Sequence, residues 1–146
     1  MYYICRQNSV IMEKYESKQR QIFKSASQIY PFISDFSLLT PAVADKVEEW
    51  QATADTCSFR VKGISVRLRM VDKAENRHVK IQGEDGGVPV DFAFWIQLHQ
   101  VAEGDTRIRL VLHAELNMMM RMMLGSTMRK GLDQAVDGLA EAFNRI

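Results

Sequence analysis

The side chains best suited to chemistry in this sequence are three histidines, two cysteines and the adjacent carboxylates of Glu84 and Asp85. Cys5 and Cys57 lie far apart and in no metal-binding spacing, so we interpret both as free thiols. Glu84 and Asp85 precede two glycines at an expected hairpin tip, where carboxylates are normally solvated, whereas paired acid–base carboxylates need partial burial. The sequence contains no G-x-S-x-G, H-E-x-x-H, C-x-x-C or phosphate-binding glycine-rich motif. It therefore identifies no catalytic residue and predicts no metal or cofactor.

The registers of the predicted hairpins place His78 opposite Trp95 and Trp95 opposite His113, in one row across three strands. Because adjacent strands are ~4.8 Å apart, the two histidines would be separated by about 10 Å. That separation is too large for one zinc ion, whose bonds to nitrogen are ~2.0–2.1 Å long. His99 shares the same outer face, so no histidine is expected inside the protein. We favour an ordinary amphipathic surface over a self-association patch, because single exposed apolar residues are common.

The bulk composition is that of one globular domain: 146 residues, 47% hydrophobic and 25% charged, with a formal net charge of +1. A charge so close to zero argues against a nucleic-acid partner. No segment approaches the ~18 apolar residues of a membrane span, and the apolar residues of the N-terminus are too interrupted for a signal peptide. We therefore expect a cytoplasmic protein with a poorly ordered extension at 1–11 and a single domain over 12–146.

Alternation of apolar and polar residues between turn signals predicts a meander of six antiparallel strands, preceded by one separate strand. The expected ranges are 13–23 for the separate strand and 47–53, 56–61, 64–72, 78–84, 89–101 and 106–115 for the meander. Two-residue turns are expected at Ala54-Asp55, Lys62-Gly63 and Gly86-Gly87, and a three-residue loop at Glu103-Gly104-Asp105.

These turns determine which residues face one another, because opposed residues in a hairpin have a constant sum of residue numbers. The predicted pairs are Trp50 with Phe59, Ala52 with Cys57, Glu49 with Arg60, Phe59 with Val66, Val61 with Ile64, Val90 with Gly83, Phe92 with Ile81, Phe94 with Val79, Leu98 with Leu110, Ile96 with Leu112 and Phe94 with Ala114. Every hairpin then sends its apolar side chains to one shared inner face, and a one-residue slip would destroy this agreement.

The inner face carries no charge, which argues against an ionic substrate bound deep inside. It supplies most of the ligand-binding residues that we predict: Trp50, Phe59, Leu68, Met70, Ile81, Phe92, Phe94, Ile96, Leu110 and Leu112. On the first strand, alternation places Ser17, Gln19, Gln21 and Phe23 on the same face. Either Gln19 or Gln21 could orient the polar end of a ligand, because a buried amide must find partners. Hydrogen bonding at the strand edge, or to water near a rim, explains them equally well.

Helical signals fill the two gaps in the strand pattern. Between the first strand and the meander, Ser25 and Gln28 fit a capping box, and Pro31 and Pro41 predict that two helices there are short. After the last strand, Asn117 is a suitable N-cap for a long helix over Met118–Asn144. Its apolar stripe consists of Met120, Met123, Leu124, Thr127, Met128, Leu132, Val136, Leu139 and Phe143.

Six methionines near the start of this helix are the most unusual feature of the composition: residues 118, 119, 120, 122, 123 and 128. Methionine is flexible and polarizable, so it suits surfaces that adapt to varied apolar partners. Met120, Met123 and Met128, together with Leu124, either fill a core seam or form the wall of a ligand cavity, and core filling is the more common outcome. We expect the remaining three to lie partly off the stripe, at an entrance or a contact patch.

The order of elements, and the segment Phe23–Phe36 with its strand end, small-residue turn, hydrophobic helix and following Asp35, resembles the START-like superfamily, also called SRPBCC. This superfamily includes birch-type pollen allergens, polyketide cyclases and lipid-transfer domains. The resemblance covers about residues 13–146. It implies an α+β helix-grip fold, in which a curved, seven-stranded antiparallel sheet wraps a long C-terminal helix and two short helices separate strands 1 and 2. It also implies a cavity between the sheet and the long helix.

The leading functional hypothesis is binding of a small hydrophobic or amphipathic molecule in that cavity, as in family members that bind lipids, sterols or polyketides. A second hypothesis is an enzyme of the cyclase, dehydrase or hydrolase kind, which requires a titratable side chain that points inward. A third is a protein-interaction domain or homodimer, suggested by Trp95 on the outer face and by the methionines off the stripe.

Overall fold

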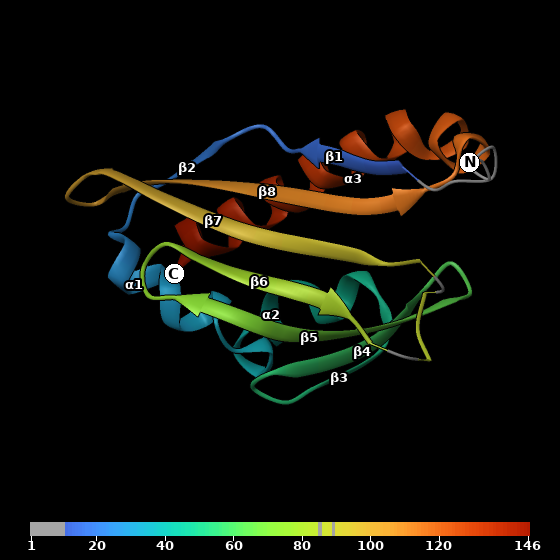
Figure 1. The fold of residues 1–146 in the computed structure, drawn as a ribbon. Helices are drawn as coiled ribbons and strands as arrows, with labels where there is room; N and C mark the ends of the chain where they lie inside the picture. Colours follow the sequence, from blue (N-terminus) through green and yellow to red (C-terminus); the bar gives the residue numbers. More distant parts are fainter. Residues whose placement is uncertain (1–10, 85, 89) are drawn as a thin grey trace.

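The computed structural model describes residues 11–84, 86–88 and 90–146, and it contains one antiparallel sheet with helices packed on one face (Figure 1). The strands are β1 (Ile11–Glu16), β2 (Arg20–Ile22), β3 (Glu48–Ala52), β4 (Thr56–Val61), β5 (Ile64–Ala74), β6 (His78–Gly83), β7 (Phe92–Ala102) and β8 (Asp105–Leu116). Their spatial order is β1-β8-β7-β6-β5-β4-β3, and β2 also pairs with β8. The α+β helix-grip architecture predicted from the sequence is therefore confirmed.

The helices are α1 (Ala26–Ile33), the 3-10 turns η2 (Phe36–Leu39) and η3 (Ala44–Lys46) on either side of α2 (Thr40–Val43), and the long α3 (Met118–Arg145). Figure 1 shows α3 crossing one face of the sheet, with its C-terminal end beside α1. The expected extension at 1–11 lies outside the described residues, apart from Ile11 at the start of β1.

The strand expected over 13–23 is divided into β1 and β2 by an irregular segment, so the sheet has eight strands instead of seven. Ser17 lies in that segment, and its side chain is buried. Its hydroxyl accepts a hydrogen bond from the Leu110 N–H at 2.9 Å and donates one to the Lys18 carbonyl oxygen at 2.7 Å. These bonds replace regular strand pairing at this point and allow the chain to change its alternation.

The changed alternation reverses the faces expected for the end of the first strand. Ile22 is fully buried, Gln21 pairs with Arg107 of β8, and Phe23 is 67% exposed. Gln19 lies on the outer face of the sheet, in a shallow polar hollow that Arg107 also lines. The prediction that Gln19 and Gln21 face inward is therefore wrong, because period-two alternation does not continue through a break.

The β4–β5 hairpin has the predicted register, with Val61 opposite Ile64 and Phe59 opposite Val66. The β3–β4 hairpin has Ala52 opposite Cys57, also as predicted. Gln51 opposite Ser58 keeps this register, but the register shifts before Glu48, so Arg60 is paired with Glu48 and the prediction of Glu49 opposite Arg60 is wrong. The reason is an irregularity between Glu48 and Gln51, where Glu49 has a φ of 57°. Such a bulge inserts an extra residue that the turn position alone does not reveal.

The β6–β7 and β7–β8 registers differ from the predictions by two residues. The observed pairs include Ile81 with Phe94, Val79 with Ile96, Leu98 with Ile108, Ile96 with Leu110, Phe94 with Leu112 and Phe92 with Ala114. The β6–β7 connection is wider than a two-residue turn, since β7 begins at Phe92, and a register shift lies between Gln100 and Ala102 near the other turn. A shift of two residues keeps every side chain on its predicted face.

The core is closed mainly by the C-terminal half of α3. Asn117 caps the helix, as predicted, by accepting a hydrogen bond from the Met120 N–H at 2.8 Å. The buried residues of the helix are Leu132, Val136, Ala140 and Phe143. The ring of Phe143 packs edge-on against Phe32 of α1, with 6.1 Å between centroids. No helix among the described residues is long and apolar enough to cross a membrane.

Candidate functional site

An apolar cavity of about 410 Å³ lies between the inner face of the sheet, the short helices and the C-terminal half of α3. This volume falls within the ~300–1,000 Å³ of typical small-molecule sites. Its lining residues are Phe36, Leu39, Ala42, Val43, Lys46, Val47, Trp50, Cys57, Phe59, Val66, Leu68, Ile81, Phe92, Phe94, Ile96, Leu110, Gln134, Ala135, Gly138 and Leu139. Of these, Lys46 is the charged residue and Gln134 the amide; the others are apolar apart from the Cys57 thiol and the Trp50 indole.

The structure brings most of the predicted inner-face residues to this cavity. Trp50, Phe59, Leu68, Ile81, Phe92, Phe94, Ile96 and Leu110 line it, whereas Met70 and Leu112 are buried in the solid core beside it. Gln19 and Gln21 belong to the outer face instead. The assignment of these side chains to ligand binding stays a prediction.

The methionine-rich start of α3 lies away from the cavity. Met120 and Met128 are partly buried and pack against the core, and Leu124 is half-buried. Met123 is 69% exposed, so its expected place in the core-facing stripe is wrong. The side chains of α3 are fully buried only from Leu132 onward. The exposure expected for the off-stripe methionines is observed, at 61% for Met118, 69% for Met119 and 79% for Met122.

Sequence reasoning missed the wall that the short helices contribute. Leu39, Ala42 and Val43 come from η2 and α2, and Val47 follows η3. These residues are too few in each element to show a helical period, so no stripe marks them. The predicted α3 wall, which ends at Met128, also lies too early in the helix, since Ala135, Gly138 and Leu139 line the cavity and the methionines do not.

Trp50 fixes the edge of the cavity next to α2. Its indole N–H donates a hydrogen bond to the Thr40 hydroxyl at 2.8 Å, and its ring lies against Phe59 with 5.8 Å between centroids. A buried indole usually needs such a partner. The bond therefore lets a large aromatic side chain face the cavity without leaving a polar atom unpaired.

Cys57 contributes a thiol to the lining, and its side chain is only 5% exposed. Burial, assisted by the negative charge of Glu84, raises the pKa of its thiol to about 12. Because the thiolate is the nucleophile, a thiol with this pKa is chemically inert near neutral pH. The buried thiol therefore forms part of the apolar wall of the cavity.

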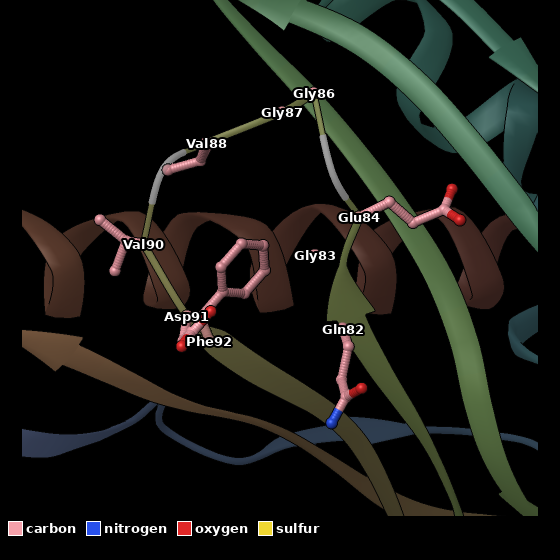
Figure 2. A pocket seen from close by; sticks show the side chains of 9 residues that line it. All are labelled: Gln82, Gly83, Glu84, Gly86, Gly87, Val88, Val90, Asp91 and Phe92. Atoms are coloured by element: carbon pink, nitrogen blue, oxygen red, sulfur yellow. The ribbon is translucent and has the colours of Figure 1, made fainter.

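A second hollow lies at the β6–β7 connection, where Glu84 of the predicted hairpin tip is one of its lining residues (Figure 2). Figure 2 shows the Phe92 ring standing next to Gly83, while the Glu84 side chain points away from that ring. Glu84 forms an ion pair with Arg69 at 3.0 Å, and Asp85 lies outside the described residues. Phe92 lines both this hollow and the apolar cavity, so its ring forms part of the partition between them.

The three histidines lie on the outer face, as predicted, but the expected row does not exist. His78 is opposite Gln97 and His113 is opposite Ala93, because of the two-residue register shifts. Trp95 nevertheless contacts the His113 ring edge-on, with 4.7 Å between centroids, and the Lys80 ammonium lies 5.3 Å from the Trp95 ring centroid. Trp95 is therefore partly covered by its neighbours instead of forming an open apolar patch.

A curved antiparallel sheet that grips a C-terminal helix over an apolar cavity defines a helix-grip protein of the START-like class. A family model for CoxG, a carbon monoxide dehydrogenase subunit, matches residues 42–145. The chain therefore belongs to the CoxG family. No curated protein sequence matches the chain.

Solved structures of low sequence identity share the fold. Norcoclaurine synthase from Thalictrum flavum superimposes with a TM-score of 0.75 at 14% identity, covering 97% of this chain and 92% of that one. The Mll3558 protein from Rhizobium loti gives a TM-score of 0.69 at 14% identity, over 91% and 98% of the two chains. The protein XoxI from Bacillus cereus gives 0.64 at 14% identity, over 90% and 96%.

Proposed function

We propose that this protein binds a small hydrophobic or amphipathic molecule in the cavity between the sheet and α3. The observation that carries the proposal is the cavity itself, with about 410 Å³ of space and walls of aromatic and aliphatic side chains. Removal of apolar surface from water stabilises a complex by roughly 25 cal/mol per Å². A hollow of this kind therefore favours a molecule that is itself mostly apolar.

Two further points support the proposal. The aromatic walls make contacts of their own, such as the Trp50–Thr40 hydrogen bond, which fixes the indole at the edge of the cavity. Norcoclaurine synthase, which shares the fold, has been solved in complex with dopamine and hydroxybenzaldehyde. That complex belongs to the other protein, but it is consistent with use of this fold to hold small organic molecules.

Catalysis in the same cavity has less support. An acid or base works best with a pKa near the operating pH, and the Cys57 thiol, with its pKa of about 12, does not meet that condition. Lys46 is exposed, at the end of η3. The described lining thus offers binding surface and little acid–base machinery.

Uptake of Nile red, a neutral apolar dye whose fluorescence rises in apolar surroundings, tests the proposal directly. Wild-type protein should bind the dye, and Ala135→Trp should weaken binding because a large ring would fill the cavity from α3. Thr127→Trp is the matched control, since Thr127 is exposed on the same helix and does not line the cavity. Equal uptake by both variants, or none by the wild type, would contradict the proposal.

A further inference from the structure

We infer that the ligand is an amphipathic anion, with an apolar body inside the cavity and a carboxylate-like end group at Lys46. The inference rests on the proposed function, because it names the chemical class of molecule for that same site. The cavity has one charged lining side chain among the described residues, and that side chain is a lysine. The described lining includes no carboxylate that would neutralise this lysine or attract a cation.

Lys46 is placed where a ligand would enter. It is the last residue of η3, it is exposed, and it lines the cavity together with Gln134 and Ala135, two residues of α3. The Lys46 Cε lies 3.5 Å from the position that a Cβ on Gly138 would occupy. The apolar stem of the lysine therefore extends over the bare backbone of α3, and a long side chain of this kind keeps its ammonium in water.

The Lys46 ammonium has no ion-pair partner among the described residues. Asp45 precedes it in the chain but does not line the cavity. Gln134 lies one helical turn before Gly138, on the same side of α3, and its amide can donate a second hydrogen bond. The mouth thus combines a free cation and a neutral donor, which is what an anionic end group requires.

The size of the cavity limits the apolar body. At about 30 Å³ for each water-sized group, 410 Å³ accommodates roughly 13 such groups. A chain of about ten carbon atoms fits within that space and leaves its end group at the mouth. Decanoate, decanol and decylamine therefore form a matched series of probes with the same body and a negative, neutral or positive end group at neutral pH.

The experiment measures displacement of Nile red by each probe at about pH 7.5 and low salt, for wild type and Lys46→Met. Methionine keeps an unbranched stem over Gly138 but has no charge. Because decanol partitions from water more readily than decanoate, the informative quantity is the ratio of their dissociation constants. We expect Lys46→Met to shift that ratio roughly three- to tenfold against decanoate, and Lys46→Glu to shift it further and to favour decylamine. Lys130→Met is the control, because Lys130 is exposed on α3 and does not line the cavity.

The outcomes separate this inference from the proposed function. If decanol and decanoate bind but Lys46→Met leaves their ratio unchanged, or Lys130→Met shifts it equally, the anionic class is wrong while the cavity still binds. If none of the probes displaces the dye from wild type and the dye itself does not bind, the proposed function is wrong. Thermal melting of each variant checks folding, and an exposed lysine should be replaceable with little change.

Discussion

Replacing Gly83 with alanine should push the Phe92 ring toward the apolar cavity. A Cβ built on Gly83 lies 2.6 Å from Phe92 Cε1 and 2.9 Å from Cζ, whereas ordinary contacts begin at 3.4 Å. The ring must therefore retreat by about 0.8 Å. Overpacking of this kind typically costs ~1–3 kcal/mol, and the better strand propensity of alanine returns ~0.5–1 kcal/mol. We expect a net loss of about 1 kcal/mol in the free energy of unfolding, because the ring can move into open space.

The movement should also reduce binding, because Phe92 lines the cavity. Urea denaturation and Nile red titration of Gly83→Ala, Phe92→Leu and the double variant provide a double-mutant cycle. Since leucine removes the ring atoms that would collide, the cycle should show a coupling free energy of at least ~0.5 kcal/mol.

Gly131→Ala is the control, because it should raise the free energy of unfolding instead of lowering it. Nothing lies within 4 Å of the Cβ position of Gly131 on α3. Alanine should stabilise that helix by up to ~1 kcal/mol. Additive effects in the cycle, or a Gly83→Ala protein as stable as Gly131→Ala, would refute the packing argument.

Two single side chains and one surface lead to further predictions. The Cys57 thiol, with a pKa of about 12, should resist alkylation by iodoacetamide at about pH 8 in the folded protein and react after denaturation. Peptide mass spectrometry measures the labelling, and rapid labelling of the folded protein would contradict the burial of this thiol. Hydrogen bonds from the Arg20 guanidinium and from Lys18 hold the pKa of the Asp137 carboxyl below its usual value. The ionised carboxylate therefore stabilises the fold at a pH above the usual pKa of aspartate, and this stabilisation is lost as the pH falls through the lowered pKa. Asp137→Asn should then lower the urea midpoint at about pH 7 and not at about pH 2. The homodimer hypothesis predicts a concentration-dependent mass in light scattering that Met119→Lys with Met122→Lys abolishes, and a constant monomer mass would count against it.

The inward and outward faces of β6, β7 and β8 could be predicted from the sequence, although the β6–β7 and β7–β8 registers could not. Side chains alternate with a period of two, so a strand displaced by two residues still presents the same residues to the core. Phe92, Phe94 and Ile96 therefore face inward despite the error in their partners. The displacements come from a widened connection before Phe92 and a register shift after Gln100. Neither feature leaves a residue pattern that distinguishes it from a tight turn.

The first strand shows where alternation stops being informative. Its break depends on Ser17 exchanging hydrogen bonds with the backbone of a distant strand, at Leu110. A serine in a strand-like segment has no local signature for such a contact. Alternation therefore predicts the wrong face for Gln19 and Gln21. It assigns the polar end of the cavity to two side chains that lie on the outer face of the sheet. Lys46, which lies in a short turn, has that role in the proposal for an anionic ligand.

The long helix separates stability from binding. Leu132, Val136 and Ala140 recur every four residues and are buried against the sheet, as a core-facing stripe requires. Ala135 and Gly138 are neighbours of this stripe in sequence, but successive residues of a helix are turned by about 100°, so they line the cavity instead. Their small size keeps space open beside the packed face. One face of α3 therefore closes the core, and the adjacent face borders the cavity. Substitutions on the first face should change the free energy of unfolding, and substitutions on the second should change ligand binding.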